Sequence, residues 1–238
     1  MDIRAEVWSP LQNTAVWLGA WLYGHEATDN LIDALRDLGS EGLVDVLRDI
    51  RQATPLDREE PAVRLVLAGP GEAPALPAGS AAARAAAGNG SGALVLADAH
   101  ILVPDAEGRW EWFVEEGPLP SPAWLSPGEA DQLLTRATDE AARLVTASGY
   151  STGALEAPRL TVGTLADFYD TPGLPSATPP RAAKLFARAD RVAAIIETVT
   201  QRMGDHRIDP HLLSLWRHIR AARTAGVAYA VREFGRLT

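Results

Sequence analysis

The segment that follows Ser9 and Pro10 is apolar on every side. Serine suits the cap of a helix, and proline suits the first helical position because its missing amide has no partner there. A helix on the surface of a globular protein keeps a polar face, and this one has none. We therefore expect other parts of the chain, or a partner protein, to cover this helix. Four side chains are its candidate interface residues: Trp17, Trp21, Leu22 and Tyr23.

One pattern occurs twice in the next segment. Residues 31–38 read LIDALRDL and residues 43–50 read LVDVLRDI, with apolar residues at the first, second, fifth and eighth positions. This spacing predicts two amphipathic helices. Gly39 suits the end of the first helix and Ser40 the cap of the second. We expect an αα-hairpin packed against the tryptophan-bearing helix, because both apolar stripes need the same third surface. The period of twelve residues is too short for a stacked solenoid repeat.

Short apolar runs separated by turn residues predict strands between residues 62 and 116. Asp105 and Gly108 suit a hairpin turn between the last two runs. In the final run aromatic residues alternate with glutamate until Phe113 breaks the two-faced pattern. A short helix is expected after the first run. The four runs are AVRLVLAG, GALVLAD, HILVP and RWEWFVEE, which predict a small, mostly antiparallel sheet of three to four strands.

The second half of the chain has the periodicity of long helices. Ser126, Pro127 and Glu129 have the spacing of a capping box, so a helix should start there and run to about residue 148. Two more helices are expected, over residues 178–204 and from residue 209 to at least 223. The predicted fold class is α+β, predominantly helical with the small sheet described above.

Charge divides the chain unevenly. Residues 181–238 hold eleven basic and five acidic side chains, whereas residues 1–180 hold eleven basic and twenty-six acidic ones. We predict an acidic unit over residues 1–158, made of the first helices, the sheet and the long helix. The basic helical segment over residues 159–238 should dock on it to form one compact unit, since opposite charges attract.

Composition excludes several classes of protein. The net charge of −9 disfavours indiscriminate binding to nucleic acid or to an anionic membrane. The chain has no cysteine, which rules out disulfides and thiol chemistry. The N-terminus lacks the pattern of a signal peptide, and the apolar run at residues 15–23 is about half the length that spans a bilayer. We expect a cytoplasmic protein without a membrane partner.

A glycine-rich loop from Gly69 to Gly79 follows the first predicted strand and precedes a helix, which is the outline of a phosphate-binding loop. It lacks the Gly-Lys-Ser/Thr motif and the spacing of a dinucleotide fingerprint. Its glutamate would also repel phosphate. We expect a plain connection and no cofactor, although a small-molecule pocket between the sheet and the helices stays an alternative.

Three residues near the last helix are weak candidates for metal ligands: His206, Asp209 and His211. Imidazole and carboxylate groups suit zinc, iron or manganese. The next histidine, His218, is two helical turns beyond His211, or about 10.5 Å along the axis, so one metal ion could not join them. Asp209 is better suited to capping the helix. We expect no metal, and no serine lies in a nucleophile elbow.

A basic face on the last helix is the candidate contact for an anion or a nucleic acid. Arg217, Arg220 and Arg223 recur every three residues, opposite a stripe of apolar residues. Such a face can contact phosphates. The preceding link is too long for a helix-turn-helix, so nucleic acid is not the expected partner.

The leading functional hypothesis is therefore a non-catalytic protein that associates with itself, as a homodimer, or with another protein. It depends on the all-round apolar helix and on the lack of a catalytic motif. The alternatives are a small-molecule binder or enzyme, and a nucleic-acid regulator that uses the last helix.

Overall fold

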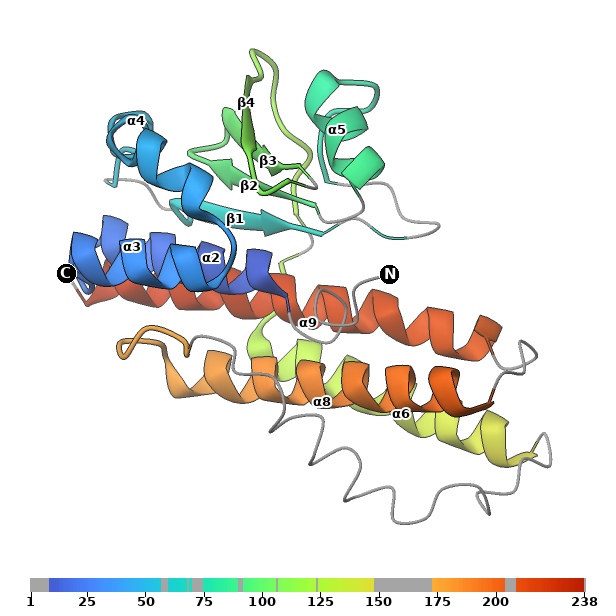
Figure 1. Ribbon diagram of the computed structural model, residues 1–238. Helices are drawn as coiled ribbons and strands as arrows, with labels where there is room; N and C mark the ends of the chain where they lie inside the picture. The colour runs from blue at the N-terminus through green and yellow to red at the C-terminus, as the bar shows by residue number, and fades with distance from the viewer. Residues whose placement is uncertain are drawn as a thin grey trace.

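The computed structural model describes residues 9–56, 60–67, 69, 75–89, 92–105, 107–122, 124–147, 173–203 and 209–237, and for 145–147, 198–203 and 209–213 it describes the backbone alone. A four-stranded sheet lies at one end and three long helices lie at the other, with two N-terminal helices between them (Figure 1). The described part contains seven α-helices and one antiparallel sheet, which confirms the predicted α+β class.

The sheet has the strand order β1-β2-β3-β4, so each strand pairs with its neighbours in sequence. All pairs are antiparallel, and the register aligns Leu65, Leu94, Leu102 and Trp112 in one row across the sheet. The strands are β1 (Val63–Val66), β2 (Ala93–Leu96), β3 (His100–Pro104) and β4 (Trp110–Val114). Because side chains alternate along a strand, this row faces one side of the sheet and its neighbours face the other.

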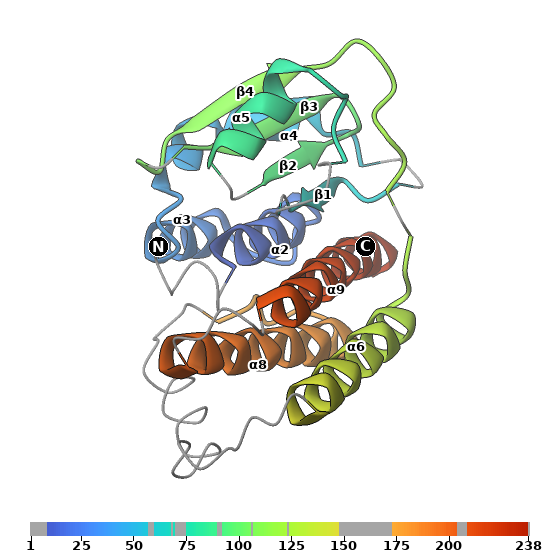
Figure 2. The ribbon, with the colours of Figure 1, turned by 90° about the vertical axis from the view of Figure 1, so that its right-hand side faces the viewer.

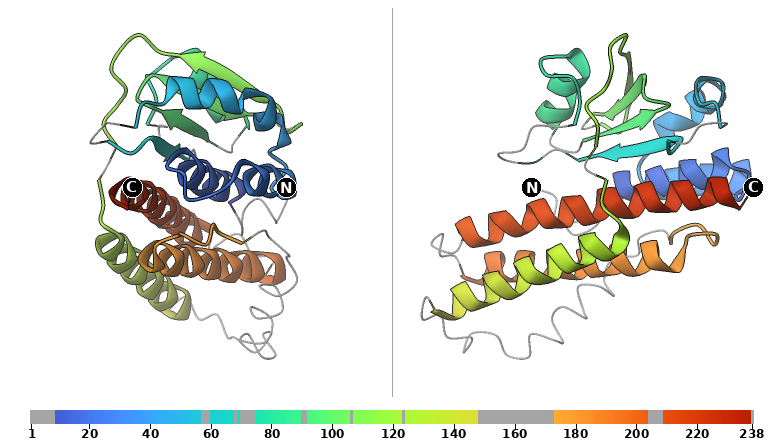
Figure 3. Two further views of the ribbon diagram at one scale, coloured as in Figure 1. Left: turned by 90° about the vertical axis from the view of Figure 1, so that its left-hand side faces the viewer. Right: turned by 180° about the vertical axis from the view of Figure 1, so that it is seen from behind.

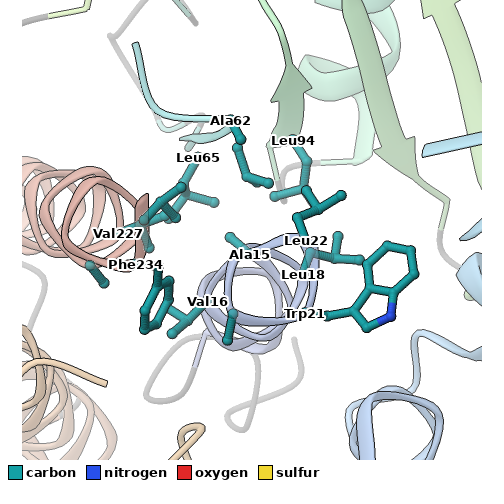
Figure 4. Packing of buried hydrophobic residues seen from close by; sticks show 14 of the residues in the cluster. Ala15, Val16, Leu18, Trp21, Leu22, Ala62, Leu65, Leu94, Val227 and Phe234 are labelled. Carbon is teal, nitrogen blue, oxygen red and sulfur yellow. The ribbon is translucent and has the colours of Figure 1, made fainter. Parts of the chain in front are cut away.

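The tryptophan-bearing helix α2 (Pro10–Leu22) lies at the centre of the larger core. The Ser9 side chain accepts a hydrogen bond from the Gln12 amide, with Pro10 in the first turn, as predicted. Figure 4 looks along α2, with Leu65 and Leu94 of the sheet above it and Phe234 of the last helix beside it.

The repeated pattern folds into two unlike pieces. Its first copy lies in α3 (Thr28–Asp37), an α-helix as predicted. The second copy begins as a 3-10 helix, η1 (Glu41–Val46), and only then becomes α4 (Leu47–Ala53). At the start of η1, a Cβ on Gly42 would lie 3.0 Å from the Gly108 carbonyl oxygen, so the turn before β4 approaches η1 closely. The local contact with that turn accompanies the tighter winding, which the apolar spacing alone did not reveal.

The other face of the sheet is covered by α5 (Ala81–Asn89). Small alanines of this helix pack against Val95, Ile101 and Val103, so helix and sheet approach closely. The segment after β4 adds Leu119 to the same cluster. Figure 2 shows α5 in front of the sheet, on the side away from α4.

The C-terminal part is a bundle of α6 (Pro127–Ala147), α8 (Pro180–Met203) and α9 (Asp209–Arg236). Ser126 and Glu129 bond reciprocally at the start of α6, which confirms the capping box. Figure 3 shows that α9 runs the length of the molecule, with α6 and α8 on one side and α2 with the sheet on the other. No helix in the described ranges is long and apolar enough to cross a bilayer.

Helix α6 packs with α8 and α9 through Leu134, Leu185 and Ile219. We expected α6 to belong with the first unit, up to residue 158. In the structure its buried residues form one cluster with those of α8 and α9. A buried ion pair between Asp190 and Arg223, 2.9 Å apart, joins α8 to α9.

Candidate functional site

The four candidate interface side chains of α2 are covered by the chain itself. Trp21, Leu22 and Tyr23 are almost fully buried, and Trp17 is half-buried. The Trp17 indole donates to the Gly173 carbonyl oxygen (3.0 Å), and the Trp21 indole donates to the Thr28 hydroxyl (3.1 Å). The apolar helix did need a cover, and α9, α3 and the sheet supply it. Its burial therefore gives no reason to expect a partner there.

The three arginines of the predicted basic face lie in three different environments. Arg217 is exposed. The Arg220 guanidinium lies against the loop after β1, where a Cβ on Gly69 would collide with it. Arg223 is buried and paired with Asp190. Three residues fall about 60° short of a full helical turn, so Arg223 lies about 120° around the helix from Arg217. This rotation carries the side chain from solvent to the core. They do not form one exposed phosphate-binding face.

The weak metal candidates fall where the structure gives no side-chain positions. His206 lies outside the described residues, and Asp209 and His211 begin α9 with only their backbone described. Among the described side chains, no group of three histidines or carboxylates could hold a metal ion. The loop from Gly69 to Gly79 is likewise described only in part, at Gly69 and from Ala75 onward.

The outermost strand of the sheet, β4, is the most exposed of the four. It pairs with β3 on one side, and no strand in the described part of the chain pairs with its other side. Figure 2 shows β4 at the edge of the sheet farthest from α9. We call this unpaired side of residues 110–114 the β4 edge.

The hydrogen bonds to β3 show which backbone groups face the β4 edge. The Asp105 amide donates to the Arg109 carbonyl (2.8 Å), and the Glu115 amide donates to the Ala99 carbonyl (2.9 Å). In an antiparallel ladder such bonded pairs alternate with pairs whose backbone groups point the other way. The register of β3 and β4 is continuous between these bonds, so three residues direct both N–H and C=O outward: Trp110, Trp112 and Val114.

The side chains of β4 add apolar surface beside these outward groups. Val114 is 61% exposed, whereas Trp110, Trp112 and Phe113 are half-buried. The Trp112 indole donates to His100 Nδ1 (3.2 Å) and packs edge-on against that ring, which fixes its orientation. Glu111 points to the opposite face and is exposed. The strand therefore carries aromatic side chains, with Trp112 held in place by His100, next to backbone groups that pair with no strand in the described ranges.

The turn before β4 is held by one carboxylate. Asp105 accepts hydrogen bonds from the amides of Glu107 (2.9 Å) and Arg109 (2.8 Å) and from Arg109 Nε (2.7 Å). Gly108 takes the left-handed conformation that this turn requires, with φ 80°. Desolvation raises the pKa of Asp105, but these hydrogen bonds outweigh it and leave the pKa below its usual value. The same contacts raise the pKa of Arg109, so both groups are ionised at neutral pH.

Proteins commonly protect an exposed edge strand with lysine, proline, a bulge or an inward-pointing charge. None of these occurs in β4: its register with β3 is unbroken, and the chain's one lysine is Lys184. The charged residue within β4, Glu111, has its side chain exposed to solvent rather than turned into the protein. The β4 edge therefore keeps the properties of a strand that can still accept another strand.

A second unusual group is the Arg64 guanidinium on β1, whose side chain is 7% exposed. Its Nη1 donates to the Pro120 carbonyl (3.3 Å), and its Nη2 lies 3.9 Å from Asp98. Its Nε and Nη2 have no hydrogen-bond partner in the described structure. Burial lowers the pKa of Arg64, while the charges of Asp98 and Glu60 oppose that shift. These nearby carboxylates already balance its charge, so the group is a weaker ligand site than the β4 edge.

Sequence reasoning did not single out β4. The runs of apolar residues predicted the strand, but a run does not say whether its strand is central or at an edge. One signal was present, because Phe113 breaks the alternation that a strand with one wet face would keep. In the structure Phe113 packs towards α5 and the tryptophans pack towards α4, so both faces carry aromatic rings.

Comparison with known families gives two adjacent matches. Residues 12–125 match the family model described as Rv1486c-like protein, N-terminal domain, and residues 128–224 match the model described as Rv1486c-like protein, C-terminal domain. The models meet just before α6, so α6 falls in the second of them. No curated protein and no solved structure matches the chain.

Proposed function

Because the chain belongs to the family of Rv1486c-like proteins and carries its N-terminal and C-terminal domains in tandem, we propose that the β4 edge of the first domain gives the protein its function. This function is association rather than catalysis. The edge docks an extended segment of a second polypeptide, which adds a fifth strand to the four-stranded sheet.

One observation carries this proposal: Trp110, Trp112 and Val114 direct their backbone N–H and C=O groups away from β3, and none of the described strands lies opposite them. An added strand would hydrogen-bond to these groups, and side-chain contacts would supply specificity. Each such hydrogen bond contributes about 1 kcal/mol net, so several are needed for stable docking. The half-buried tryptophans and the exposed Val114 add apolar area that docking removes from water.

Amide hydrogen exchange tests the proposal directly. In dilute protein the amides of Trp110, Trp112 and Val114 should exchange quickly, and those of Glu111 and Phe113 slowly, since the latter bond to β3. A synthetic peptide with the sequence of residues 109–116 serves as the probe strand. In excess it should slow exchange at the three outward amides and leave β1 unchanged. If the peptide changes none of them, the β4 edge is not a docking site.

A matched pair of variants separates the backbone from the side chain. Val114→Pro removes one outward N–H without touching a bond to β3, and proline is tolerated on an open edge. Val114→Thr keeps that N–H and nearly the same shape. We expect the proline variant to lose peptide binding and the threonine variant to keep most of it. Equal loss in both would point to the side chain alone and contradict docking by strand addition.

A further inference from the structure

We propose that the strand that docks on the β4 edge is β4 of a second copy of this chain. The two strands run antiparallel about a two-fold axis beside Trp112, and two four-stranded sheets become one continuous sheet of eight strands. This inference rests on the proposed function, because it names the partner that the same edge accepts.

The charges along β4 select this register. With Trp112 opposite Trp112 of the second copy, Arg109 stands opposite Glu115 of that copy, and the reverse pair forms across the axis. Glu111 then stands opposite Phe113 rather than another carboxylate. Opposite charges that face each other across two strands stabilise the pairing, and like charges destabilise it.

Neighbouring registers place like charges together. A shift that centres the axis on Glu111 puts two glutamates directly opposite each other. A shift that centres it on Phe113 puts Glu111 opposite Glu115 of the second copy, twice. The register centred on Trp112 avoids both arrangements and overlaps the whole strand. The chain therefore carries a self-complementary pattern of charge on its unpaired strand.

The backbone groups fit the same register. A two-fold axis beside Trp112 lets this residue exchange both of its hydrogen bonds with Trp112 of the second copy. Trp110 does the same with Val114 of the second copy, on each side of the axis. Every outward N–H and C=O of these three residues then has a partner. No outward group of the strand is left unpaired.

The side chains add a cross-strand aromatic contact. Trp112 is already oriented by its hydrogen bond to His100, so two such indoles meet side by side with little loss of rotamer freedom. On either side of them the exposed Val114 packs beside Trp110 of the other copy. A pair of five-residue strands buries less than the ~800 Å² per partner of a standard interface, so we expect dissociation constants in the micromolar range or above.

Sedimentation equilibrium over a dilution series at physiological salt tests the inference through a charge exchange. Arg109→Glu alone and Glu115→Arg alone each turn two attractive pairs into two repulsive ones, so each should weaken the dimer about tenfold. An equimolar mixture of these two variants places glutamate opposite arginine at both pairs. The mixture should therefore dimerise more tightly than either variant alone, although Arg109→Glu also removes the bonds to Asp105 and Glu107.

Arg36→Glu is the control for the change of charge, because Arg36 is also an exposed arginine and bonds to a nearby aspartate, Asp33 in α3 (3.1 Å). It should leave the dimer unchanged, and urea unfolding checks that every variant is folded. Failure of the mixture to restore the dimer would overturn the register and this inference with it.

The two proposals fail in different ways. If the wild type stays monomeric at millimolar concentration while the peptide of residues 109–116 still protects the outward amides, the edge docks strands but not a second copy. The self-pairing inference is then wrong and the proposed function stands. If neither the second copy nor the peptide protects those amides, both are wrong.

Discussion

The two edge strands of the sheet, β1 and β4, differ in what lies beyond them. All four residues of β1 are buried, and α2 and α9 pack against it. It also points the guanidinium of Arg64 inward, which is one of the ways in which proteins discourage further pairing. In β4 no residue is fully buried, and no strand in the described part of the chain pairs with the side that faces away from β3. One sheet therefore has an edge closed by its own helices and an edge left open.

This difference shows that an apolar sequence alone does not tell whether an element is available to a partner. The helix α2 has a strongly apolar sequence but offers little surface to a partner, because its side chains form part of the chain's own core. The segment with mixed sequence, β4, leaves both apolar side chains and backbone groups at the surface. The following changes test how far this contrast between β1 and β4 holds.

The largest expected effect comes from changing one apolar side chain on each edge strand to alanine. Leu65 of β1 is 1% exposed, so Leu65→Ala should cost about 3 kcal/mol of the free energy of unfolding by leaving a cavity. Val114→Ala on β4 should change it by less than about 0.5 kcal/mol. Urea unfolding measures both. A large loss in Val114→Ala would mean that the β4 edge is covered in the folded chain.

A smaller effect is expected at Asp98, whose carboxylate lies near the buried Arg64 of β1. Asp98→Asn keeps a residue that tolerates the left-handed φ of 58° but removes the carboxylate near Arg64. The loss should be about 1 kcal/mol, because Asp98 is partly screened by solvent. In an Arg64→Met background the same change should cost less than in the wild type. An equal loss in both backgrounds would show that Asp98 does not act through Arg64.

The smallest expected effect is a dependence on pH at the turn before β4. Hydrogen bonds from Arg109 and Glu107 outweigh desolvation and hold the pKa of Asp105 below 3.8, its usual value. A lowered folded pKa stabilises the protein above 3.8, and that contribution is lost as the pH falls through 3.8 and then the folded pKa. Asp105→Asn should therefore lose less stability than the wild type between pH 5 and pH 2. Melting temperatures across this range measure the difference, and parallel curves would contradict it.

Local sequence signals predicted the elements well but not their environments. The Ser9 and Ser126 caps, the strands and the long helices were predictable because each depends on a few neighbouring residues. The buried ion pair between Asp190 and Arg223 joins two helices far apart in sequence, and helical periodicity does not show which of several arginines will face the core. The open edge at β4 depends on strand order, which apolar runs do not encode.

The unequal halves of the repeated pattern give the same lesson. Both copies have apolar residues at the same positions, yet the second is wound partly as a 3-10 helix where Gly42 meets the turn at Gly108. Periodicity predicted which residues would be inside, such as Leu35 and Leu47. It did not predict the winding, which accompanies a contact with residues more than sixty positions away.

Helix α9 is shared between the two family domains, and this bears on how the protein is made. The match to the C-terminal domain ends at residue 224, but Val227, Val231 and Phe234 lie beyond it and fill the core around α2. A ribosome adds these side chains well after the four strands of the sheet. The apolar core of the first domain therefore stays incomplete during synthesis until α9 has been made and has packed against α2.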